Sequence, residues 1–107
     1  MRKVLFLTPA VAFLLGLGAA AAVANEIDDG RALVEANCAR CHSIERSGDS
    51  PHPDAPPFRQ LHERYPLTAL EEAFAEGIST GHPDMPQFVA TPEQITEILA
   101  YIQSLSN

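Results

Sequence analysis

The sequence predicts an all-α domain, and three of its features support the prediction. Apolar residues recur at helical spacing in two segments, 67–74 and 95–105, and no segment alternates apolar and polar residues as a half-buried strand would. Thr91, Pro92 and Gln94 precede the second segment in the order of a capping box, which marks the start of a helix. The stretches between the periodic segments are rich in proline and glycine, which is typical of loops.

The first 24 residues differ from the rest of the chain. Two basic residues near the start are followed by an almost continuous apolar stretch and then by small residues that end at Ala24. This order is typical of a secretory signal peptide that is cleaved after Ala24. We therefore expect residues 1–24 to be a signal peptide and residues 25–107 to be one exported domain. The alternative is an uncleaved membrane anchor, since Val4–Ala24 is just long enough to span a bilayer.

The predicted mature chain is strongly acidic. The full chain has a formal net charge of −7, and removal of Arg2 and Lys3 with the signal peptide leaves about −9 and no lysine. Such a surface repels nucleic acid and anionic lipid headgroups, and it favours partner proteins with basic docking patches. Acidity also keeps an exported protein soluble, and the composition is compatible with both explanations.

Four helices are expected in chain order. Asp28 or Asp29 suits the N-cap of the first, and residues 58–65 suit a short second helix. A third begins at Leu67 and ends before Gly77, a glycine in the C-cap region. The last helix starts after Thr91 and has the clearest apolar stripe. The inward-facing residues expected on the first and last helices are Ile27, Leu33, Val34, Ile95, Ile98, Leu99, Ile102 and Leu105.

The residues with distinctive chemistry are Cys38-Ala39-Arg40-Cys41-His42. Two thiols three positions apart, followed by a histidine, have the spacing of a c-type haem attachment site, in which the thiols form thioethers and the imidazole binds the iron. A Cys38–Cys41 disulfide would close too short a loop to constrain the chain. A thioredoxin-like pair needs a βαβ setting, and a zinc site needs further closely spaced ligands, which the sequence does not offer. We therefore predict one covalently bound haem c.

Met85 is the candidate for the second axial ligand of the iron. It is the only methionine outside the predicted signal peptide, and it lies in a loop with prolines on both sides that would hold a thioether with little loss of entropy. His/Met pairs are common ligand sets of electron-transfer haems. His82 is the alternative ligand, and gap filling in the core is the alternative role of Met85. His52 and His62 are expected to be ordinary solvated histidines.

From about residue 29 to residue 105 the chain resembles the class I cytochromes c, and among them the small mono-haem proteins of bacteria. The resemblance rests on the C-x-x-C-H motif and on a Met-Pro pair that precedes an amphipathic last helix. It also rests on Gly30, Val34 and Tyr101, which match the positions where the family's first and last helices cross. The resemblance implies a cytochrome c fold, in which three to four helices surround one covalent haem and the N- and C-terminal helices cross.

The resemblance also implies a periplasmic single-electron carrier, not an enzyme, in which His42 and Met85 bind the iron and a carbonyl of Pro56 or Pro57 holds the ring of His42. The eukaryotic members dock through lysines that this chain lacks, so their partners are not implied; a monomer with redox partner proteins is expected. Two alternatives stay open: a haem c subunit of a dehydrogenase or oxidase complex, and a sensor or peroxidase-like enzyme with one open haem face. The expected pocket lining is Leu61, Leu67, Leu70, Phe74, Phe88, Ile95, Ile98 and Leu99.

Overall fold

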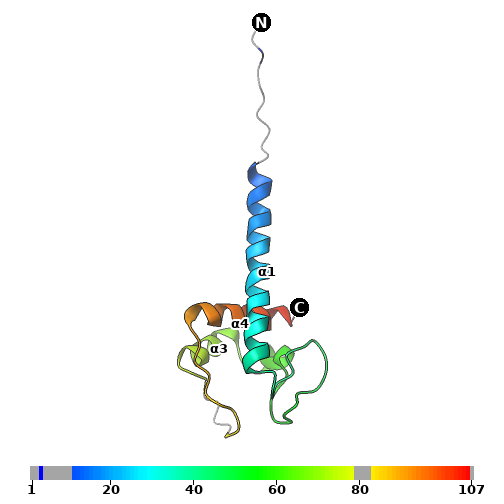
Figure 1. Ribbon diagram of the computed structural model, residues 1–107, viewed down its shortest axis with the longest axis vertical. Helices are drawn as coiled ribbons and strands as arrows, with labels where there is room; N and C mark the ends of the chain where they lie inside the picture. The colour runs from blue at the N-terminus through cyan, green and yellow to red at the C-terminus, as the bar shows by residue number, and fades with distance from the viewer. Residues whose placement is uncertain (1–2, 4–10, 79–82, 107) are drawn as a thin grey trace.

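The computed structural model of the chain describes residues 3, 11–78 and 83–106, and the regular secondary structure of these ranges consists of helices joined by loops (Figure 1). Its elements are α1 (Val11–Asn37), the 3-10 turn η1 (Phe58–Gln60), α2 (Leu61–Arg64), α3 (Leu67–Ala75) and α4 (Pro92–Ser104). Within the described ranges the extended pairing is limited to one isolated bridge, between Ile78 and Phe88. The predicted all-α class is confirmed.

The two terminal helices cross at Gly30, where α4 lies over the C-terminal half of α1 (Figure 1). A Cβ atom added to Gly30 would overlap the carbonyl oxygen of Glu97 in α4, so the helices approach as closely as they do only because glycine has no side chain. Val34 is 0 % exposed and Ile98 is 1 % exposed, which places the centre of the core beside this crossing. Tyr101 is also buried there, so the crossing predicted at Gly30, Val34 and Tyr101 is confirmed.

The first helix begins earlier than expected. The sequence predicts a start at Asp28 or Asp29, but α1 runs without a break from Val11 through both aspartates and through the predicted cleavage point after Ala24. The alanine-rich segment before the aspartates has a high helix propensity, and extending a helix needs no new nucleus. Residues 18–26 of α1 are exposed. Among the described residues, no helix is both long and apolar enough to cross a membrane.

The later helix ends match their sequence signals. Gly77, just after α3, has φ +83°, a backbone conformation that glycine adopts without strain. At the start of α4 the Thr91 hydroxyl accepts a hydrogen bond from the Gln94 N–H at 3.2 Å, and the Gln94 side chain accepts one from the Thr91 N–H at 3.0 Å. Phe74 of α3 meets Phe88 edge to face, with ring centroids 6.4 Å apart. The helix C-cap and the capping box are therefore as predicted.

We expect Gly30→Ala to destabilise the haem-loaded mature protein by about 1–3 kcal/mol, because the new methyl group would force the backbones of α1 and α4 apart. Ala32→Leu is the matched control, since it adds a larger side chain at an exposed position of the same helix and should change stability by less than about 0.5 kcal/mol. Urea unfolding measures both. Equal losses in the two variants would contradict the close crossing.

Candidate functional site

The C-x-x-C-H motif forms a helical turn at the end of α1. The N–H of Cys38 donates to the carbonyl of Val34 at 2.8 Å, and the N–H groups of Cys41 and His42 donate to the carbonyl of Cys38 at 3.2 and 2.9 Å. Both cysteines are half-buried free thiols. The structure therefore brings the two predicted attachment thiols and the predicted iron ligand together on one turn.

The Cys38 thiol is poorly suited to redox exchange. Burial raises the pKa of this thiol to about 11, so it stays protonated at neutral pH. Thiol–disulfide exchange needs a thiolate, which reactive cysteines form through a lowered pKa. The thiol environment therefore disfavours the thioredoxin-like alternative.

His42 is oriented by two residues from the far end of the following loop. Its Nδ1 lies 2.8 Å from the carbonyl oxygen of Pro56, and since a carbonyl only accepts hydrogen bonds, Nδ1 carries the proton. The lone pair of Nε2 is then the one available to a metal. The Phe58 ring packs against the imidazole at a tilt of 53°, with centroids 5.1 Å apart. Such contacts fix the ring of a metal-binding histidine and raise its basicity. Of the two prolines that the resemblance implies, the structure selects Pro56 and not Pro57.

Met85 is half-buried and packs against the hydrophobic core. Cys38 is another of the partly buried residues that border this core. The prediction that Met85 is the second iron ligand stays a prediction, and the alternative ligand His82 lies outside the described residues. What the structure adds is the position of Met85 at the edge of the core.

His52 differs from the prediction. It is half-buried and links the loop after His42 to the residue before Met85. The backbone N–H of His52 donates to the carbonyl of Cys41 at 3.0 Å. The ring Nδ1 of His52 accepts a hydrogen bond from the backbone N–H of Asp54 at 3.1 Å. A neutral His52 ring therefore carries its proton on Nε2, which lies 3.2 Å from a carboxylate oxygen of Asp84. The prediction of an ordinary solvated histidine is thus wrong for His52, while His62 is exposed as expected.

The arrangement of these residues fits one haem c. Two free thiols and a histidine with its Nε2 available lie on one turn, next to apolar side chains that the protein covers only in part. Within the part of the chain that the structure describes, no group of three or more His, Cys, Asp or Glu side chains is placed to hold a metal ion, so the zinc alternative gains no support there. Of the expected lining, five residues are buried: Leu61, Leu70, Phe74, Ile95 and Ile98. Three remain partly exposed: Leu67, Phe88 and Leu99.

The contacts of Phe58 and His52 were missed in the sequence, because neither residue belongs to a motif and their partners, His42 and Asp84, lie 16 and 32 positions away. A signal does exist for Phe58, since it follows the Pro-Pro pair from which the carbonyl was expected. No local pattern pairs His52 with Asp84.

Two comparisons with known proteins find similar sequences. A protein-family model described as Cytochrome c matches residues 27–106. A curated protein of Synechocystis sp., described as cytochrome c-553-like, is 30% identical over 84 residues, which cover 78% of this chain and 73% of that protein. No solved structure matches the chain significantly.

We expect the mature chain, purified under denaturing conditions, to keep the added mass of one haem. Cys38→Ser combined with Cys41→Ser should remove that mass and leave the chain largely unfolded, because a domain this small depends on its cofactor for a core. Ser47→Ala, at an exposed serine of the following loop, is the control and should keep the haem. Intact-mass spectrometry and far-UV circular dichroism measure both effects. A wild-type chain without the tetrapyrrole mass would refute the attachment site.

Proposed function

Because the chain belongs to the cytochrome c family, we propose that it is a periplasmic single-electron carrier whose haem iron takes His42 and Met85 as axial ligands. Family membership implies one covalently attached haem c, the cofactor predicted from the C-x-x-C-H motif. When bound, the haem supplies reversible one-electron chemistry at its iron. The observation that carries the proposal is the hydrogen bond from His42 Nδ1 to the Pro56 carbonyl, because it leaves Nε2 for the iron.

The residues around the site would keep the ligands fixed while the charge on the iron changes. The Pro56 carbonyl and the Phe58 ring restrict the imidazole of His42. A thioether such as that of Met85 is a soft ligand that favours the reduced state and raises the reduction potential. With both axial positions filled by the protein, no position is left for a substrate, which is why we propose a carrier instead of an enzyme.

We propose that the carrier docks on proteins with basic patches. The support is charge: the mature chain has about nine more negative than positive formal charges. Glu71, Glu72 and Glu76 of α3 are exposed, so part of this charge faces solvent. Attraction between opposite charges accelerates encounter and gives a contact that a carrier can leave quickly.

The oxidised protein should show the weak near-infrared band of a sulfur–iron bond, and Met85→Ala should abolish it. His82→Ala is the matched control, because His82 is the alternative ligand in the same loop, and it should keep the band. The absorption spectrum measures both variants. A Met85→Ala protein that retained the band would disprove the ligand assignment. A wild-type protein that bound carbon monoxide readily when reduced would favour the open-site alternative.

When the full chain is expressed in a bacterium with a c-type haem attachment system, we expect the mature protein in the periplasmic fraction, starting at Asn25. The reason is the order of basic, apolar and small residues that ends at Ala24. N-terminal peptide mass spectrometry of the fractionated cells measures the cleavage point. Recovery in the membrane fraction with residues 4–24 still attached would show an anchored protein instead.

A further inference from the structure

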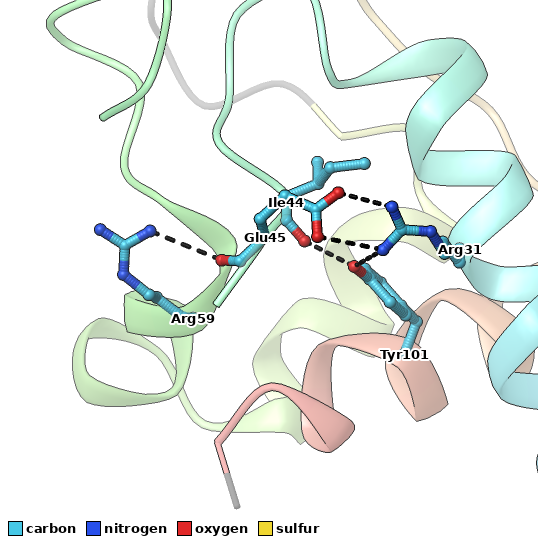
Figure 2. A network of polar contacts seen from close by, with 5 residues as sticks. All are labelled: Arg31, Ile44, Glu45, Arg59 and Tyr101. Atoms are coloured by element: carbon cyan, nitrogen blue, oxygen red, sulfur yellow. Dashed lines mark hydrogen bonds and ion pairs between the residues drawn. The ribbon is translucent and has the colours of Figure 1, made fainter. Parts of the chain in front are cut away.

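Three successive carbonyl oxygens follow His42, and each accepts a hydrogen bond from a different part of the chain. Figure 2 shows two of these bonds and the side chains that make them. The pairs are the Phe58 N–H with the Ser43 carbonyl at 2.9 Å, the Tyr101 hydroxyl with the Ile44 carbonyl at 2.5 Å, and Arg59 Nη1 with the Glu45 carbonyl at 3.5 Å. The backbone beside the predicted iron ligand is thus fixed at three consecutive residues.

Arg31 connects this segment to α1. Its guanidinium donates to both carboxylate oxygens of Glu45, at 3.2 and 2.5 Å, and to the Tyr101 hydroxyl at 3.0 Å (Figure 2). The hydrogen bond from Arg31 lowers the pKa of the Glu45 carboxyl, which keeps the pair ionised. The Tyr101 hydroxyl therefore accepts from α1 while it donates to the Ile44 carbonyl.

The phenol of Tyr101 has a function that the helix crossing does not require. A phenylalanine ring would pack against Gly30 equally well, but it would leave the buried Ile44 carbonyl without its donor. Tyr101 is only 4 % exposed, and burial raises the pKa of its phenol. The hydroxyl consequently stays protonated, and remains a donor, up to a higher pH than that of an exposed tyrosine.

The effect of this hydrogen bond reaches His42 through a short path. Ile44 follows Ser43, whose carbonyl accepts from the Phe58 N–H. Phe58 packs against the imidazole of His42, and Pro56, two residues earlier, accepts the hydrogen bond from Nδ1. Displacement of the Ile44 carbonyl therefore displaces the ring contact and the acceptor of His42 together.

We propose that Tyr101 is a positioning residue for the axial ligand: its hydroxyl, supported by Arg31, holds the segment after His42 so that the imidazole keeps its hydrogen bond to Pro56. The inference rests on the proposed role of His42 as an iron ligand. It assigns to the last helix an influence on the electronic properties of the site, through the segment after His42, in addition to its packing.

The test compares Tyr101→Phe with Tyr65→Phe in the haem-loaded mature protein. Tyr65 is 46 % exposed, so its variant removes a hydroxyl that faces solvent. We expect Tyr101→Phe to speed solvent exchange of the His42 Nδ1 proton by about tenfold, because the loop that protects this proton opens more often. NMR of the reduced protein measures the exchange rate. The reduction potential should rise, since a histidine with a weaker hydrogen bond is less basic and stabilises oxidised iron less. Tyr65→Phe should change neither quantity.

A purely structural role for Tyr101 would lower stability but leave the exchange rate and the potential at wild-type values, and that result would overturn the proposal. Arg31→Gln is the second variant, which keeps the phenol and removes its support; it should move both readouts in the same direction by a smaller amount. If instead the wild-type protein lacks the spectrum of a histidine-ligated haem, the proposed function has failed and this inference fails with it, whereas unchanged readouts in the Tyr101→Phe protein overturn this inference alone.

Discussion

The structure depends on one close approach, that of α1 and α4 at Gly30. Because no side chain lies between the helices, the Glu97 carbonyl occupies the space that a Cβ would fill. The approach brings Arg31, the next residue of α1, to the Tyr101 hydroxyl of α4. It also fixes the C-terminal end of α1, from which the Cys38 turn continues without a linker. The position of the attachment turn relative to the core is therefore set by a helix crossing and not by a loop.

The crossing has an electrostatic cost. Partial burial raises the pKa of the Glu97 carboxyl, and the negative charges of Asp29, Glu93 and Glu26 raise it further. A carboxyl whose pKa is higher in the folded chain than in the unfolded chain binds protons more tightly when folded. It therefore favours folding more as the pH falls through the raised pKa, and less at neutral pH where it is ionised. Burial of Val34 and Ile98 at the crossing supplies favourable free energy that opposes this repulsion.

The sequence was most informative where a local pattern has a single backbone solution. Gly77 with its positive φ and the Thr91–Gln94 capping box were predictable because their partners lie within three residues. The attachment turn was predictable for the same reason, since its spacing alone specifies the chemistry. The predicted start of α1 was wrong, because an N-cap residue such as Asp28 does not interrupt a helix that already runs through the alanine-rich segment before it.

The contacts that were not predicted join residues far apart in the chain. His52 meets Asp84, and the Tyr101 hydroxyl meets the Ile44 carbonyl 57 residues earlier. Such pairs depend on which loop the fold brings to which helix, and no periodicity encodes that. The family resemblance predicted the helix crossing at Gly30 and the packing of the Tyr101 ring there. It did not predict the hydrogen bond of the phenol oxygen, because a crossing pattern specifies only close packing.

Most of the arginines of the predicted mature chain bind groups of the protein itself. Arg31 binds Glu45, Arg46 donates to the Ser104 carbonyl at 2.8 Å, and Arg59 donates to the Ser43 hydroxyl at 3.3 Å. Three of the five arginines of the predicted mature chain thus hold the segment after His42 or the end of the last helix. Most of the basic side chains therefore brace the fold and few are left to form a basic docking ring, which supports the proposal that the protein docks on basic patches of its partners.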